Sequence, residues 1–290
     1  MYSYIRAEKA SNPKVKISLM CRVLGVATSS YYDWVHRVNG PPSIRAMQEK
    51  SLLEEITLIH HQFSYYGSPR VHAELRKRHR QCSRGLVARI MREYGLHARR
   101  GKPKDRPRSA PPVRKVELKD RVQQAFTAPG PNRLWFTDLT MIRTGEGVLR
   151  AAVILDAWNR EVISWATADH ETPATVMTAL REAIRIRRPQ AGCVIHSDRG
   201  YQFTSQEWAD IADAGQLLLS VTQRKNPRDN AVMESWFGSF KNEDLYPRGI
   251  PATLADARLR LFRYIHEYNT VRMHSTLDYR SPNEFAQNPQ

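Results

Sequence analysis

Apolar residues in the second half of the chain come in short runs that turn residues separate. The runs are either rich in β-branched and aromatic residues, as in strands, or repeat with helical spacing. In chain order we expect strands at residues 134–142, 148–155 and 161–167, a helix at 173–187, a strand at 194–196, a helix at 205–215, a strand at 217–221 and a helix through Glu234. This order predicts an α/β domain built on one sheet.

Residues 1–98 predict helices instead. Two short helices flank Gly25 within residues 14–37, and Thr28 or Ser29 is the expected N-cap of the second. Further helices are expected at 47–61, from an N-cap at Ser68 onward, and from an N-cap at Ser83 to Gly95. Two helices around a glycine-containing turn are typical of helix-turn-helix modules, although many helical hairpins share the pattern.

Two later helices have an apolar stripe. At about 100° per residue, one face of the helix through Glu234 is formed by Met233, Trp236, Phe237 and Phe240. Asn230, Glu234 and Lys241 follow the edge of this stripe, so an amide, a carboxylate and an ammonium group line one side of a buried helix. A further helix at 254–269 has apolar residues roughly on one face: Leu259, Phe262, Ile265 and Tyr268.

The excess positive charge is confined to the first part of the chain. The formal net charge is +16, from 45 Lys and Arg against 29 Asp and Glu. Residues 1–115 hold 24 basic and 8 acidic residues, whereas residues 116–290 hold 21 of each. Such asymmetry indicates a polyanion-binding part joined to a part with another task. We expect the first part to bind duplex DNA with a steep salt dependence.

Residues 99–116 are basic and rich in proline, a composition that does not form a packed core. We place the domain boundary there and expect four regions: a helical DNA-binding region at 1–98, a linker at 99–116, a core at 117–245, and a C-terminal helix and tail at 246–290 packed on the core. We expect neither a secretory leader nor a transmembrane helix, because residues 1–10 lack an apolar segment and no apolar run reaches about 18 residues. Three widely spaced cysteines favour unpaired thiols in a reducing cytoplasm.

Three carboxylates stand on different elements of the expected sheet domain. Asp138 lies inside the first strand, Asp198 directly follows the fourth, and Glu234 lies on the helix. Hard cations such as Mg²⁺ are the usual reason for a fold to bring separate carboxylates together. Two such ions can stabilise the attacking and leaving oxygens of a phosphodiester. Asp156 is a competitor, but it precedes a turn, and we expect it to be structural.

The three carboxylates, with 35 residues between Asp198 and Glu234, resemble the DDE triad of retroviral integrases and related transposases. The surrounding motifs are similar to those of one group, the OrfB transposases of the insertion sequence 3 family. They are HSDRGYQF at 196–203, DNAVMES at 229–235 and YNTVRMHSTLDYRSPNEF at 268–285. The likeness runs from about Ile17 to Phe285 and includes YYGSPRVHAELR and MREYGLHARR, which resemble the helix-turn-helix-like segment of that family.

The resemblance implies an α/β ribonuclease-H-like (integrase) core after an all-α helix-turn-helix-like region. It implies a bacterial transposase that cleaves DNA at the ends of its element and joins the strands to a target. Two Mg²⁺ or Mn²⁺ ions would be held by Asp138, Asp198 and Glu234, with Asp138 bridging both. The implied setting is the cytoplasm, on the nucleoid, as an oligomer on DNA, alone or with the upstream OrfA product as partner or fusion.

Two alternatives remain. A nuclease of the same fold would cut strands without joining them, but the HSDRGYQF and YNTVRMHS motifs argue against it. A catalytically silent DNA-binding regulator is disfavoured by the intact triad. Contacts with DNA are expected from Asn230, Lys241, Arg199, Arg224, Lys225, Arg228, Arg70, Arg76, Arg84 and His274. For Lys241 and the arginines of the helical region the competing role is a solvated surface charge, and for His274 it is packing.

Overall fold

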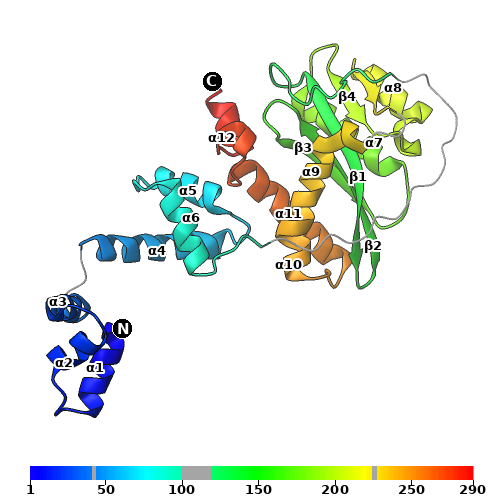
Figure 1. Ribbon diagram of the computed structural model, residues 1–290. Coiled ribbons are helices and arrows are strands. Elements are labelled where there is room, and N and C mark those ends of the chain that lie inside the picture. Colours follow the sequence, from blue (N-terminus) through cyan, green and yellow to red (C-terminus); the bar gives the residue numbers. More distant parts are fainter. Residues whose placement is uncertain (41–43, 100–118, 224–226, 290) are drawn as a thin grey trace. The chain divides into compact units, whose positions relative to one another are not determined.

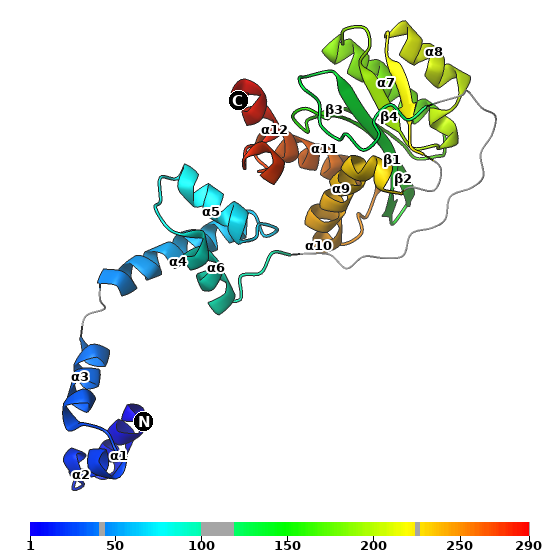
Figure 2. The same ribbon diagram turned by 45° about the horizontal axis from the view of Figure 1, so that its top comes forward.

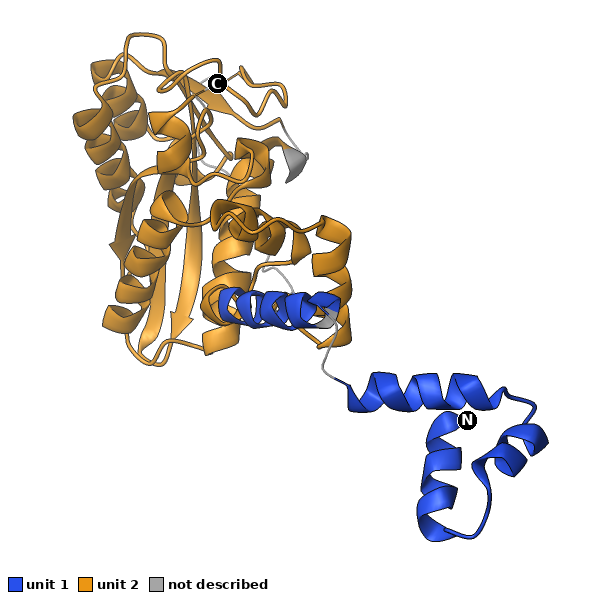
Figure 3. Cartoon of the chain, turned by 90° about the vertical axis from the view of Figure 1, so that its left-hand side faces the viewer, with its two compact units in different colours: residues 1–59 blue, residues 60–290 orange. Residues whose placement is uncertain are grey.

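The structure is a computed structural model that describes residues 1–40, 44–99, 119–223 and 227–289. The chain separates into two compact units, residues 1–59 and 60–290, which are coloured separately in Figure 3. The helices that follow His60 therefore belong with the sheet and not with the helices before them. The linker expected at 99–116 lies, apart from Arg99, outside the described residues.

The first unit is helical. It contains α1 (Tyr2–Ser11), α2 (Ile17–Val23), α3 (Thr28–Asn39) and most of α4 (Ile44–Gln62). The hairpin around Gly25 is confirmed, and this glycine has a φ of +66°, which a left-handed turn requires. The expected cap of α3 is wrong. Thr28 is already helical, and Ala27 takes the N-cap position without a side-chain hydrogen bond.

Two helices open the second unit, α5 (Ser68–Lys77) and α6 (Arg84–Glu93). Ser83 caps α6 as predicted, because its hydroxyl accepts the amide of Leu86 at 3.2 Å. The cap of α5 differs from the prediction: Gly67 is its N-cap, and Ser68 is the first helical residue.

The predicted sheet is present with all five strands. They are β1 (Leu134–Thr144), β2 (Gly147–Asp156), β3 (Val162–Ala168), β4 (Val194–Ser197) and β5 (Leu218–Val221), in the spatial order β3-β2-β1-β4-β5. The first three form an antiparallel meander, while β4 pairs in parallel with β1 and β5 with β4. The helices between the later strands are α7 (Ala174–Arg187) and α8 (Gln206–Ala214).

Helices cover both faces of this sheet (Figures 1 and 2). On one face lie α7 and α8, and on the other α9 (Ala231–Phe240) and α11 (Leu254–Thr270). The chain closes with α12 (Pro282–Gln287). This mixed five-stranded sheet between helical layers, after a helical region, is the ribonuclease-H-like arrangement that the sequence predicted. Within the described part of the chain, no helix is both long and apolar enough to span a membrane.

The apolar face expected on α11 is confirmed at Ile265 and Tyr268, which are buried, but not at its other two residues. Leu259 and Phe262 are 44% and 54% exposed. The residues that pack into the core are Ala257, Leu261, Tyr264, Ile265 and Tyr268. The helix has two overlapping apolar stripes, and its aromatic contacts with Trp236 decide which of them is buried.

Candidate active site

Strand β1 directs Asp138 toward helix α9. Side chains alternate between the two faces of a strand, so Leu134, Phe136 and Asp138 share one face. Leu134 and Phe136 belong to the core cluster that includes residues of α9 and α11, whereas Trp135 packs in the cluster on the α7 and α8 side. Asp138 therefore lies on the same side of the sheet as Glu234.

Strand β4 brings Asp198 beside Asp138. The parallel register pairs Leu134 with Val194 and Phe136 with His196, and the pairing ends there. Continuing this register by two residues sets Asp138 next to Asp198 at the point where the strands separate. The Oδ1 atom of Asp198 accepts the amide of Gly200 at 2.7 Å, and a Cβ atom at Gly200 would lie 2.9 Å from that oxygen. Gly200 thus leaves room for the carboxylate.

The start of α9 is tied to both strands. Asn230, the N-cap residue, donates from Nδ2 to the Thr137 carbonyl on β1 at 3.3 Å. On β4, His196 Nε2 lies 3.1 Å from the Asp229 carbonyl oxygen, and its Nδ1 lies 2.8 Å from Ser220 Oγ on β5. These bonds hold Glu234, one turn into α9, beside the two aspartates.

His196 is a supporting residue that the sequence reasoning did not single out. It is fully buried, and its two ring nitrogens join β5 to the chain just before α9. Burial lowers its pKa, which favours the neutral ring. A histidine inside an apolar strand run, next to a candidate carboxylate, was the signal that could have identified it.

The charges of the site act on one another. Burial raises the pKa of Asp138, the negative charges of Asp198 and Glu234 raise it further, and the Leu139 amide and Lys241 oppose them, leaving a value of about 7. Burial also raises the pKa of Asp198, against the hydrogen bond from Gly200. Three carboxylates and an ammonium group, all half-buried, therefore lie within electrostatic reach of one another.

The donor chemistry of Asp138, Asp198 and Glu234 fits a hard divalent cation, because carboxylate oxygens are its preferred ligands. Mutual repulsion in a half-buried site is what a bound cation relieves. In their present side-chain positions, no three acidic, histidine or cysteine residues in the described segments form a metal-binding cage. Binding would therefore require rotation of these side chains toward a shared ion.

The expected DNA contacts near the site have different surroundings. Lys241 is half-buried and lies close enough to lower the pKa of Asp138. Arg199 is exposed, and its Nε donates to the Thr222 carbonyl at 2.7 Å. Arg224, Lys225 and the side chain of Arg228 lie outside the described residues. Asn230 is buried, and its Oδ1 accepts no hydrogen bond from the part of the chain described here.

The other candidates divide into exposed and engaged side chains. Arg76 on α5 and Arg84 on α6 are exposed, and their contact with DNA stays a prediction. Arg70 instead pairs with Glu243 at 3.9 Å. His274 is buried with its ring 4.6 Å from that of Tyr268, and burial together with nearby arginines lowers its pKa to about 2. Of the two roles expected for His274, packing is the one that this position favours.

Asp156 has the surroundings of a structural residue. It is buried, and it accepts the amides of Asn132 at 2.8 Å and Trp158 at 3.0 Å, which closes the turn after β2.

Comparison with known proteins places these features in a family. An integrase core domain model matches residues 128–227, a second matches residues 216–282, and a helix-turn-helix-like domain model matches residues 47–104. The chain is 31% identical over 288 residues to transposase InsF for insertion sequence IS3A of Escherichia coli K12, covering 98% of this chain and 97% of that protein. It is 32% identical over 248 residues to the transposase for insertion sequence element IS904 of Lactococcus lactis, covering 84% and 96%.

Among solved structures, the HTLV-2 integrase catalytic core domain in complex with magnesium aligns with a TM-score of 0.39 and 20% identity. The alignment covers 50% of this chain and 91% of that one.

Proposed function

The chain belongs to the insertion sequence 3 family of transposases and acts in DNA transposition through an integrase catalytic core, and we propose that Asp138, Asp198 and Glu234 are its catalytic carboxylates. The observation that carries this proposal is their convergence at one edge of the sheet. Two neighbouring strand ends supply the aspartates, and the start of α9, bonded to Thr137, supplies the glutamate.

We further propose that these carboxylates hold two divalent cations, Mg²⁺ or Mn²⁺, with Asp138 between them. The ions would supply positive charge to the attacking and leaving oxygens of a phosphodiester during in-line displacement. Asp138 would release its proton on binding a cation, since its pKa is raised to about 7 and ligands bind in their deprotonated form.

The cationic side chains complete the site for DNA. Lys241, beside the carboxylates, would bind a backbone phosphate of the element end, because phosphate contacts fix the position of a duplex. Exposed Arg76 and Arg84 would add contacts that carry no sequence information by themselves. Cleavage at the element end, joining to a target, assembly as an oligomer on DNA and cooperation with an OrfA product belong to the same proposal.

A strand-joining assay on a labelled DNA end tests the triad. Asp138→Asn, Asp198→Asn and Glu234→Gln should each reduce cleavage and joining by at least about 1,000-fold while DNA binding stays measurable. Asp213→Asn, on the exposed side of α8, is the matched control and should keep wild-type activity. Full joining by any of the three triad variants would refute the assignment. Cleavage without joining by the wild-type chain would favour a nuclease.

A further inference from the structure

Helix α9 continues beyond Phe240 without leaving helical geometry. It passes through a π turn (Lys241–Leu245) into α10 (Tyr246–Arg248), and the residues at both junctions, Phe240 and Tyr246, have right-handed helical backbone angles. Hydrogen bonds in a π turn span five residues instead of four, and such turns are frequent at functional sites. The direction of every side chain from Lys241 onward therefore depends on where the π turn begins.

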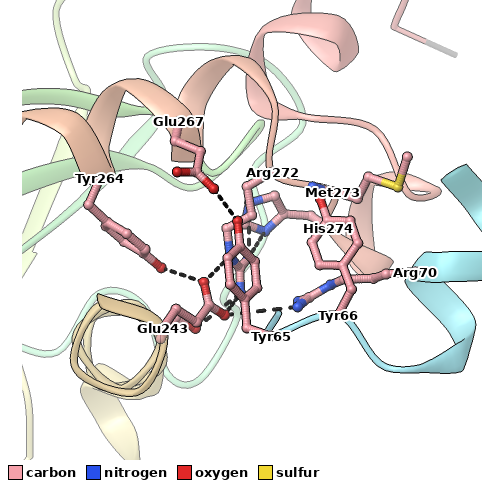
Figure 4. Close-up of polar contacts among 10 residues, drawn as sticks. Tyr65, Tyr66, Arg70, Glu243, Tyr264, Glu267, Arg272, Met273 and His274 are labelled. Carbon is pink, nitrogen blue, oxygen red and sulfur yellow. Dashed lines mark hydrogen bonds and ion pairs between the residues drawn. The ribbon is translucent and has the colours of Figure 1, made fainter. Parts of the chain in front are cut away.

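Glu243, inside this turn, is the centre of a buried polar cluster (Figure 4). Its side chain is 8% exposed. One oxygen accepts Arg272 Nη2 at 2.5 Å, and the other accepts Arg272 Nε at 2.7 Å and the Tyr264 hydroxyl at 2.9 Å. A bidentate pair of this kind fixes direction as well as distance.

Arg272 spans the junction between the α-helix and the π turn. Its side chain is 5% exposed, and Nη2 also donates to Ser239 Oγ at 3.3 Å. Ser239 precedes the junction and Glu243 follows it. The guanidinium is planar and rigid, so contacts on both sides of the junction hold the two segments in one register.

The helix-turn-helix-like segment packs on the same cluster. Arg70 pairs with Glu243, the Tyr66 hydroxyl accepts the Met273 amide at 3.0 Å, and the Tyr65 hydroxyl donates to Glu267. Arg70 of α5 thus contacts Glu243 directly, while the two tyrosines before α5 contact Glu267 and the backbone next to Arg272.

The desolvation of two buried charges offsets most of their attraction, so a buried ion pair adds little stability over an apolar pair. Its distinctive property is that it permits a single geometry. This pair lies across the start of the π turn that contains Lys241, so its geometry affects the direction of the Lys241 side chain.

We propose that Glu243 and Arg272 are positioning residues, which hold the junction of α9 and the π turn in the register that sets Lys241 beside Glu234 and Asp138. The proposal rests on the proposed function of the three carboxylates. Lys241 would contact one phosphate among many, so the pair should act mainly on the alignment of the bound DNA end, and hence on kcat, and only weakly on the overall binding of DNA.

Arg272→Lys tests it, because lysine keeps the charge but cannot contact Ser239 and both Glu243 oxygens at once. We expect kcat for end joining to fall about 10- to 100-fold, the scale of a small misplacement, while KM for the end DNA changes less than about threefold. The matched control is Tyr66→Phe, which removes a hydroxyl that bonds neither Ser239 nor Glu243. Tyr66→Phe should keep the wild-type kcat even if its thermal midpoint falls as far as that of Arg272→Lys.

A double-mutant cycle identifies the residue through which Arg272 acts. If the pair works by placing Lys241, then Arg272→Lys added to Lys241→Ala should lower kcat by less than about threefold beyond Lys241→Ala alone. Losses that multiply overturn the proposal, as does wild-type kcat in either single variant. An equal loss of kcat in Tyr66→Phe also overturns it, because the effect would then be general destabilisation.

If Arg272→Lys does not fold, Tyr264→Phe removes only the hydroxyl that Glu243 accepts. It should lower kcat by about three- to tenfold with the same non-additivity toward Lys241→Ala, and an unchanged kcat counts against the pair. The triad variants distinguish the two proposals: joining by Asp138→Asn refutes the proposed function, whereas inactive triad variants with an active Arg272→Lys refute only the positioning role.

Discussion

Two charge clusters flank helix α9, and they are built in opposite ways. At its start, Asp138, Asp198 and Glu234 lie in a half-buried site, where burial and then the repulsion between the carboxylates raise the pKa of Asp138 to about 7. Past its end, the side chain of Glu243 is 8% exposed, and Arg272 and Tyr264 satisfy its oxygens. The buried charge of Glu243, which belongs to the packing of the fold, is therefore balanced by its partners. The fold leaves destabilising charges where a ligand is to bind, which is the pattern of a functional site.

Breaking the compensated cluster should have the largest effect on stability. Arg272→Ala leaves Glu243 buried without its main partner, so the free energy of unfolding should fall by about 3–5 kcal/mol. Chemical denaturation measures it. The double variant Arg272→Met with Glu243→Leu should recover part of the loss, because the buried carboxylate is removed and the Arg70 side chain, 24% exposed, still reaches water. A loss below about 1 kcal/mol in Arg272→Ala would contradict the described compensation.

Relieving the repulsion among the three carboxylates should have the opposite sign. Asp138 keeps its proton up to about pH 7 in the folded chain but loses it near its ordinary pKa when unfolded, so stability falls as the pH rises through that window. Asp138→Asn removes this fall. With EDTA at pH 8 it should gain about 2–4 kcal/mol, at about 1.4 kcal/mol per pKa unit. The gain should shrink toward pH 4, and Asp213→Asn should show none.

A bound divalent cation should also stabilise the cluster of Asp138, Asp198 and Glu234. At ten times its dissociation constant, Mg²⁺ or Mn²⁺ should raise the free energy of unfolding by about 1.4 kcal/mol. Asp198→Asn should lose this response. Arg272→Lys should keep it, because the proposed metal ligands do not include Arg272 or Glu243. A thermal shift of equal size in the Asp198 variant would show that the ion binds elsewhere.

Removing an exposed ion pair should have the smallest effect on the free energy of unfolding. Lys77 on α5 and Glu284 on α12 lie 2.7 Å apart, but their side chains are 40% and 42% exposed. Lys77→Ala should change the free energy of unfolding by less than about 1 kcal/mol, because water screens the pair. A change as large as that of Arg272→Ala would mean that burial does not explain the difference in stability between the Glu243–Arg272 and Lys77–Glu284 pairs.

The strands and most helices could be predicted because their signals are local. The apolar run around Asp138 and the cap at Ser83 depend on residues a few positions apart, and the structure confirms them. The buried face of α11 could be predicted only in part, because the packing of Tyr264 against Trp236 depends on another helix. The π turn after Phe240 could not be predicted either, because the spacing of apolar residues does not distinguish it from an α-helix.

The site itself was predicted only in part. Sequence motifs identified Asp138, Asp198 and Glu234 as candidates, but not the β1–β4 register that makes the aspartates neighbours. The Glu243–Arg272 pair joins a residue of the π turn to one in the irregular segment after α11, and no periodicity relates them. Arg70, expected on DNA, is engaged by Glu243 because the segment before α5 packs on the C-terminal helices.

The two hydrogen bonds at the start of α9 have a mechanical consequence. Asn230 joins the helix to β1, and the Asp229 carbonyl joins it to β4 through His196. Each of the three elements that carries a carboxylate is thus coupled to the other two within one turn of backbone. Thermal motion of the sheet will carry the helix start along with it, so the spacing of the carboxylates should fluctuate less than the elements themselves.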